Sequence, residues 1–212
     1  RLVGAGIITA VSLGSTNVVG TPFVNLASPT GLTIDGKVVI QWGGPGTAGL
    51  GETTNPHGFN LGSNAQLYFS ATTAGSAVLN VDRSGNSSQI YGLLASIPAL
   101  GFSPALFVAN ANGIVVGAGG RIVAPTGVGL IGADLSSATS QNDFVANNGW
   151  DLLTPPGTPV LGTSYLSYGT IPATGNVSIA GAINGDEFVN LPAKYIFIGG
   201  NNVDVLNTGN LF

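Results

Sequence analysis

The segment from Ala105 to Pro125 restricts the fold more than any other part of the sequence. Its connections are too short to hold helices, and they consist of Asn, Gly and Ala. Consecutive short strands bent at residues that tolerate positive φ are typical of a chain wound into a β-helix. We therefore predict an all-β protein, a right-handed parallel β-helix. The strands and corners that carry this prediction are Leu106–Val108, Asn110-Ala111-Asn112-Gly113, Ile114–Val116, Gly117-Ala118-Gly119-Gly120 and Ile122–Val123.

Similar short apolar runs bounded by Gly, Asn, Pro or Ser recur along the chain. One helical turn is conceivable at Ser87–Leu94, where a strand is still favoured. At about 20 residues per turn, the chain would form on the order of eight to ten turns. A β-sandwich, the main rival fold, would need longer alternating strands. The other expected strands are Ile7–Val11, Val18–Val19, Leu32–Ile34, Val38–Gln41, Gln66–Phe69, Ala77–Val81, Gln89–Leu93, Gly127–Ile131, Asn176–Ile179, Lys194–Ile198 and Asn202–Leu206.

The chain is expected to form a single domain, 1–212, with excursions from the β-helix at 43–56 and 147–174. Charged residues make up 7% of the sequence, against about 25% in ordinary proteins. A hydrophobic content of 44% argues against disorder, and Arg121 and Pro125 interrupt the best candidate for a membrane span. Because a net charge of −4 gives little repulsion between copies, we expect self-association.

Residues for catalysis or metal binding are sparse. The single histidine, His57, lies in a predicted turn, there is no cysteine, and the nine acidic residues are scattered. Asp82 and Arg83 are expected to form a local ion pair. The segment Gly199–Asn207 approximates a calcium-binding nonapeptide, but it occurs once and has Asn202 where glycine is required. We therefore expect no enzyme, no cofactor, no metal and, with five dispersed cations, no nucleic-acid partner.

The N-terminal region suggests a processed, exported chain. The sequence begins at Arg1 and contains no methionine, which is expected of a mature protein whose signal peptide has been removed. The apolar run 2–13 is expected to be a first strand or a cap. In an assembly it is the candidate for a strand exchanged between copies, through Leu2, Val3, Ile7, Ile8, Val11 and Leu13.

Three blocks of sequence resemble the two-partner-secretion domain of filamentous-haemagglutinin-type adhesins. Phe107–Ile122 is similar to the family signature LxNPNGIxFGxGAxVxV, with Ala111 in place of the proline. Gly58–Gly62 is similar to the family's FNIG segment, and residues 76–94 to its AVLNRV and SQIxGxL segments. Asp143-Phe144 stands where the family has a DF pair, so the family-like core covers about residues 58–145, and the stretch before residue 55 has no counterpart.

The resemblance implies a non-enzymatic protein that is secreted to the bacterial cell surface and acts in adhesion, with a host or surface glycan as a partner. It also implies that an outer-membrane transporter recognises the secretion motif, which here comprises Asn110, Asn112, Gly113, Ile114 and Gly117. The alternative for this corner is a purely structural turn, since stacked Asn side chains can bond between turns. Two other functions remain open. One is a self-assembling subunit of an extracellular filament or surface layer. The other is a β-helix that binds or cleaves carbohydrate, with Trp42, Trp150, Tyr165 and Tyr168 as stacking platforms.

Overall fold

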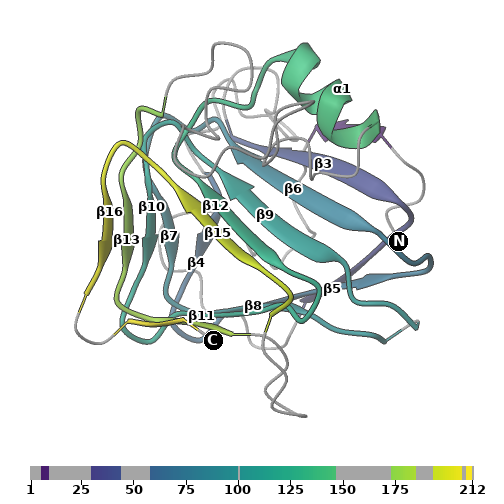
Figure 1. Ribbon diagram of the computed structural model, residues 1–212, viewed down its shortest axis with the longest axis horizontal. Helices are drawn as coiled ribbons and strands as arrows, with labels where there is room; N and C mark the ends of the chain where they lie inside the picture. Colours follow the sequence, from purple (N-terminus) through teal and green to yellow (C-terminus); the bar gives the residue numbers. More distant parts are fainter. Residues whose placement is uncertain are drawn as a thin grey trace, which may run out of the picture.

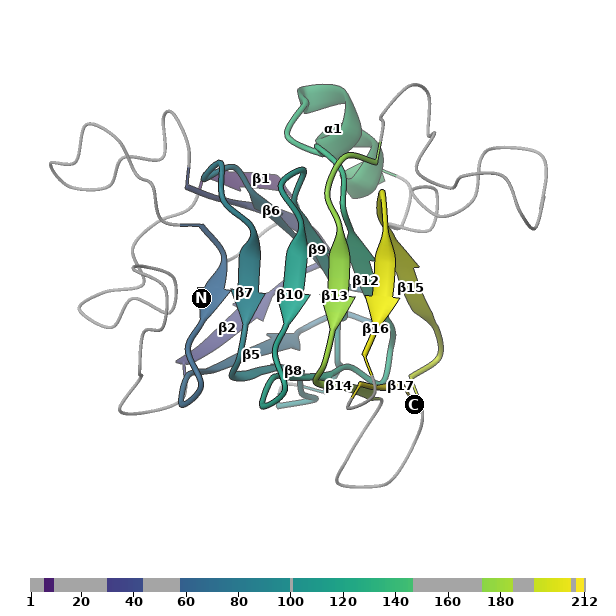
Figure 2. The same ribbon diagram turned by 90° about the vertical axis from the view of Figure 1, so that its left-hand side faces the viewer.

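The computed structural model describes residues 6–9, 30–43, 58–99, 101–146, 173–184, 193–206 and 209–211. Their strands form three sheets, A, B and C, in which every neighbouring pair is parallel. From β2 (Thr30–Ile34) onward, each strand pairs with the strand three places later, so the chain visits the three sheets in rotation (Figures 1 and 2). This arrangement confirms the predicted parallel β-helix.

Sheet A contains β1 (Gly6–Thr9), β3 (Lys37–Trp42), β6 (Ala77–Asp82), β9 (Ala105–Ala109), β12 (Val128–Ile131) and β15 (Ile196–Gly199). Sheet B contains β2, β5 (Gln66–Ala71), β8 (Leu93–Ser96), β11 (Arg121–Val123), β14 (Ala182–Asn184) and β17 (Asn210–Leu211). Sheet C contains β4 (Asn60–Leu61), β7 (Ser88–Ile90), β10 (Ile114–Val116), β13 (Val177–Ile179) and β16 (Val203–Val205).

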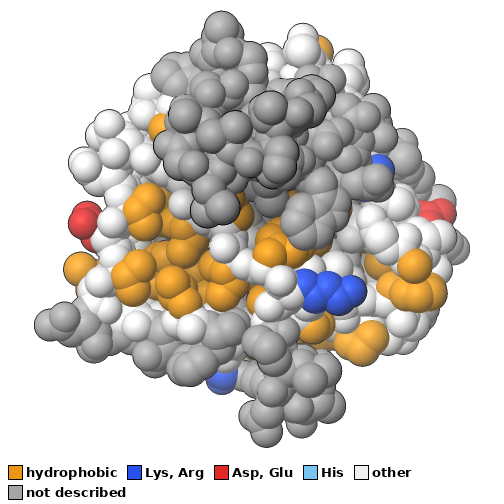
Figure 3. All heavy atoms as spheres, viewed as in Figure 1, with side chains coloured by type: hydrophobic (Ala, Val, Ile, Leu, Met, Phe, Trp, Pro, Cys, Tyr) orange, Lys and Arg blue, Asp and Glu red, His pale blue; other side chains and the backbone are white. Residues whose placement is uncertain are grey.

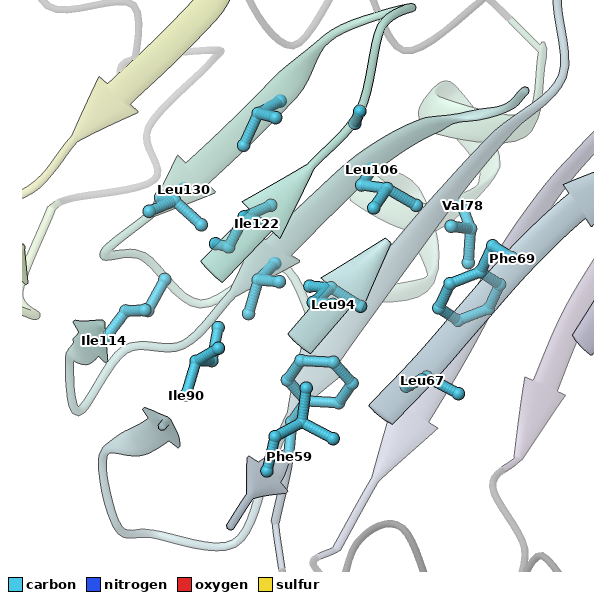
Figure 4. Close-up of a cluster of buried hydrophobic side chains, with 14 of the residues drawn as sticks. Phe59, Leu67, Phe69, Val78, Ile90, Leu94, Leu106, Ile114, Ile122 and Leu130 are labelled. Atoms are coloured by element: carbon cyan, nitrogen blue, oxygen red, sulfur yellow. The ribbon is translucent and has the colours of Figure 1, made fainter. Parts of the chain in front are cut away.

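The core inside the three sheets is a set of apolar side chains stacked in register from turn to turn. On sheet B, Leu94 pairs with Leu67 on one side and Ile122 on the other, and all three are fully buried. Sheets A and C contribute equivalent rows, so Leu106 and Ile114 point into the same core (Figure 4). Because successive residues of a strand point to opposite faces, a strand of three to five residues is long enough to place one or two of its side chains in the core.

The number of turns is smaller than predicted. Within the described residues, each sheet has five or six strands rather than eight to ten. Leu94 and Ile122 hold equivalent positions on successive turns but lie 28 residues apart along the chain. The next equivalent residue, Ile183, is a further 61 residues away, since the whole of the predicted excursion 147–174 lies between the two. Both predicted excursions lie outside the described residues, apart from Gly43 and residues 173–174.

Most predicted strands are confirmed, with bounds shifted by one or two residues. The run Gln89–Leu93 is an exception, because a bend at Gly92 divides it between β7 and β8. Strands β4, β14 and β17 were not predicted, and the predicted strand Val18–Val19 lies outside the described residues.

Glycines at the bends from sheet C to sheet B are required by close packing between turns. Gly120 directly precedes β11, and a Cβ there would overlap the carbonyl oxygen of Ile90 on the preceding turn. The same clash with a backbone carbonyl recurs at the residues before β8, β14 and β17, which are Gly92, Gly181 and Gly209. The backbone of one turn thus lies directly against that of the next, which leaves no room for a side chain.

A single helix is described, α1 (Ala138–Ala146), and the sequence did not predict it. It begins after Ser137, whose Oγ accepts a hydrogen bond from the amide of Ser140 at 3.1 Å, as an N-cap does. The high content of Gly and β-branched residues argues against long helices, but it does not exclude a short helix with a serine N-cap. With nine residues, α1 is far too short to cross a bilayer.

Helix α1 packs on the outward face of sheet A, where a second apolar cluster lies. The ring of Phe144 meets that of Phe107 edge-on, with 5.5 Å between centroids. Tyr195 packs on the same cluster, and its burial raises the pKa of the hydroxyl above the usual value. On the face seen in Figure 3, hydrophobic and uncharged side chains predominate over charged ones.

Candidate functional site

The predicted secretion motif occupies the bend from sheet A to sheet C in the middle of the β-helix. Strand β9 ends at Ala109, residues 110–113 make the bend, and β10 follows at once. We call residues 110–113 the Asn corner. The amide of Gly113 donates to the carbonyl of Asn110 at 3.1 Å, which closes a β-turn with Ala111 and Asn112 at its centre.

Asn110 is a structural residue of this corner, with 1% of its surface exposed. Its Nδ2 donates to the carbonyl of Asn86 at 2.8 Å and to Oγ of Ser88 at 3.0 Å, both on the preceding turn. Its Oδ1 accepts from the amide of Asn112 at 2.8 Å, which is an Asx turn. The side chain therefore joins two turns of the helix and shapes its own loop.

Asp82 extends this network by one turn. Its carboxylate is 5% exposed and accepts hydrogen bonds from the amide of Phe59 (2.8 Å), the amide of Ser84 (2.9 Å) and Oγ of Ser88 (2.7 Å). Ser88 thus connects Asp82, on the same turn, to Asn110 on the next turn, and with Phe59 on the preceding turn the network spans three turns. The predicted ion pair between Asp82 and Arg83 is wrong. The Arg83 guanidinium donates instead to Oε1 of Gln41 at 2.6 Å, because adjacent residues of a strand point to opposite faces.

Three further motif residues are also explained by the fold. Gly113 has φ of 105° and lies against the backbone of Asn176 on the next turn, so a side chain there would be strained and crowded. Ile114 is fully buried in the core. Gly117 lies under the ring of Tyr91, which occupies the space that a Cβ would need.

Asn112 is different, because its side chain is exposed and makes no hydrogen bond among the described residues. Only its amide is used by the fold. The central turn position before it, Ala111, is one where proline is favoured, and its amide has no acceptor in the described structure. The turn therefore needs no hydrogen bond from the amide of residue 111, so alanine fits it as proline would.

The predicted assembly strand is described only in part. Residues 6–9 form β1, in which Ile7 pairs with Val39 and Ile8 with Ile40 of the same chain. Leu2, Val3, Val11 and Leu13 lie outside the described residues.

The carbohydrate platforms are not supported at the one position described. Trp42 is 3% exposed, belongs to the core and donates from Nε1 to Oδ1 of Asn80 at 3.0 Å. It is therefore not a stacking surface, which corrects the sequence-based expectation. Trp150, Tyr165 and Tyr168 lie outside the described residues, as does His57.

No group of three or more His, Cys, Asp or Glu side chains that could hold a metal is present among the described residues. In the nonapeptide-like segment, Asn201 and Asn202 donate from Nδ2 to Oδ1 of Asn176 at 3.2 and 3.4 Å. Asp204, on β16, is exposed. Asn201 and Asn202 thus bond to the preceding turn.

The last described turn ends in exposed apolar side chains. Val203, Val205 and Leu211 are 43%, 48% and 41% exposed, whereas their partners Val177, Ile179 and Ile183 one turn earlier are fully buried. Each exposed residue thus occupies an inward stacking position with no further described turn above it. Strands β15, β16 and β17 are the end strands of their three sheets, so their outer backbone edges are also unpaired within the described structure.

Comparison with known proteins gives one distant relative. The chain is 27% identical over 199 residues to a heme/hemopexin-binding protein of Haemophilus influenzae. The match covers 94% of this chain but 18% of the relative, so the chain spans less than a fifth of that protein. No protein-family model and no solved structure matches the chain.

Proposed function

We propose that this chain is a secreted bacterial surface protein of the two-partner-secretion type, in which the β-helix presents the Asn corner to an outer-membrane transporter and then serves in adhesion. The observation that carries the proposal is the Asn corner. Its fold accounts for Asn110, Gly113, Ile114 and Gly117, whereas the side chain of Asn112 is exposed and forms no hydrogen bond within the described part of the chain. The similarity to a bacterial binding protein over nearly the whole chain supports a binding role rather than an enzymatic one.

In this proposal Asn110 and Asn112 have different roles at the corner. Asn110 holds the bend through bonds to the preceding turn, so its substitution affects folding first. Asn112 projects from the bend and is free to donate and accept at a partner surface. Recognition is therefore assigned to Asn112, and it can be tested without damaging the β-helix.

Asn112→Ala is expected to reduce export at least about tenfold, which corresponds to the loss of roughly 1.4 kcal/mol of recognition. The chain would be produced with an added N-terminal signal peptide in cells that carry a two-partner-secretion transporter. Export is the ratio of protein in the medium to protein in the periplasm. The unfolding midpoint of purified Asn112→Ala should stay at the wild-type value.

Asn64→Ala is the matched control, because Asn64 is also an exposed turn asparagine without a described side-chain hydrogen bond, but it lies at a different corner. This variant should be exported normally. If Asn112→Ala is exported as well as Asn64→Ala, recognition by the Asn corner is rejected.

We propose self-assembly as a second function for the chain as given, because apolar side chains are exposed on its last described turn. Val203, Val205 and Leu211 offer apolar side chains at stacking positions, and the low charge of the chain gives little repulsion. Stacking of one copy on this end of another would bury these side chains and pair the open strand edges. Such contacts repeat end to end and lead to filaments.

We expect the wild-type chain to sediment as concentration-dependent oligomers and Val205→Asp to sediment as a monomer. The introduced carboxylate would be desolvated in the contact, which disfavours stacking. Asp204→Asn is the control, because residue 204 precedes Val205 on the same strand and points to the opposite face. A wild-type chain that stays monomeric at high concentration rules out assembly through this end.

Haem binding does not transfer directly from the relative. The aligned part is 18% of that protein, so the ligand named for it need not be bound by the part that this chain matches. We therefore propose the shared feature to be the exported β-helix rather than the ligand.

A further inference from the structure

Helix α1 lies late in the sequence but contacts the first strands of the β-helix. It packs against both β1 and β3, although Gln41 of β3 and Gln141 of α1 are separated by 100 residues. The chain therefore returns from the middle of the β-helix to its N-terminal end. This contact was not anticipated from the sequence.

A row of polar side chains fixes the helix to the sheet. Nε2 of Gln41 donates to Oε1 of Gln141 at 2.7 Å, while Oε1 of Gln41 accepts from Arg83 at 2.6 Å. Nε2 of Gln141 donates in turn to the carbonyl of Leu135 at 3.2 Å. Gln141 is 1% exposed, so the cost of leaving its amide unpaired would be high. This arrangement specifies where α1 sits.

Apolar contacts add to the polar ones. Phe144 is 1% exposed and belongs to the same cluster as Val39 of β3, Leu79 of β6 and Phe107 of β9. Together these strands present an apolar outward face, and α1 covers part of it. The helix is thus hydrogen-bonded to β3 through Gln41 and packed against β3, β6 and β9.

Strand β1 has few other supports. In the described structure β1 is a short end strand of sheet A, and its sheet partner is β3. Strands in the middle of the β-helix, such as β10, have a paired strand on each side. The N-terminal end is therefore the part whose stability depends most on what covers it.

We propose that α1 is a clasp that holds the N-terminal turn of the β-helix closed, so that β1 and β3 become fully protected only when the chain through residue 146 has folded. The clasp acts through Gln141 and Phe144. The proposal concerns the folded chain itself and holds whether or not the protein is exported by the proposed route.

Hydrogen–deuterium exchange of the whole chain tests the clasp. In Phe144→Ala, the amides of β1 and β3 should exchange at least tenfold faster relative to those of β10 and β13 than they do in the wild type. Gln141→Ala should give the same pattern with a smaller ratio. Asn142→Ala is the control, since Asn142 is an exposed helix residue, and its exchange pattern should match the wild type.

An equal acceleration in all strands of either variant would overturn the proposal, because it indicates ordinary global destabilisation. A change confined to α1 would overturn it as well. If Phe144→Ala does not fold, the exchange pattern of Gln141→Ala decides whether α1 acts as a clasp. This variant removes no apolar volume from the cluster.

Discussion

Replacing Asp82 with alanine is expected to lower the free energy of unfolding by about 3–5 kcal/mol, because three hydrogen bonds to a buried carboxylate are lost together. Its oxygens accept from the amides of Phe59 and Ser84 and from Oγ of Ser88. At 5% exposure, the site gives water little access to the abandoned donors. Since Ser88 also bonds Asn110, the loss should extend to the Asn corner.

Urea unfolding followed by tryptophan fluorescence measures this effect, with the buried Trp42 as one of the reporters. Asp134→Ala is the matched control. Asp134 is exposed and accepts one bond in its own loop, from the amide of Ser136 at 2.8 Å. Asp134→Ala should lower the free energy of unfolding much less than Asp82→Ala. Equal losses in the two variants would mean that the buried network contributes little to stability.

Gly120→Ala is expected to destabilise the protein by about 3 kcal/mol, the upper end of the usual cost of overpacking. A methyl group at this position would overlap the carbonyl oxygen of Ile90 and lie 3.0 Å from that of Gly117. Both are backbone atoms of tightly stacked turns, so no side chain can swing aside to make room. The two turns would have to separate, which weakens the hydrogen bonds on both sides of the bend.

The adjacent substitution Gly119→Ala provides the control. A Cβ at Gly119 meets only the carbonyl oxygen of Tyr91, at an ordinary 3.6 Å, and the residue is exposed. We expect an unfolding midpoint close to the wild-type value for Gly119→Ala and a clearly lower one for Gly120→Ala. Similar midpoints would show that the turns are less tightly stacked at this bend than the structure indicates.

The order of short strands could be predicted because each is a local pattern. An apolar run such as Ile114–Val116 between Asn and Gly corners indicates a strand, its inward side chains and the bends on either side within a few residues. The motif residues could likewise be placed at a corner. Which of them serve the fold was less clear, because the partners of Asn110 are Asn86 and Ser88, one turn away.

The errors arise where a residue's role depends on a neighbouring turn. The spacing between turns varies because loops are inserted between them, so the number of turns could not be obtained from the length alone. Trp42 looked like an exposed ring, but its partner Asn80 is 38 residues away and both are buried. Asp82 next to Arg83 suggested an ion pair, whereas the alternation of a strand separates the two side chains.

The parallel β-helix could be predicted without coordinates, since its strands and bends are specified by neighbours along the chain. Three features became visible only in the folded molecule: the network of Asp82, Ser88 and Asn110, the contact between turns at Gly120, and the return of α1 to the first turn. The physical reason is the same in each case. In a β-helix, the atoms that a residue touches belong to the turns before and after it, and their distance along the chain follows no local rule.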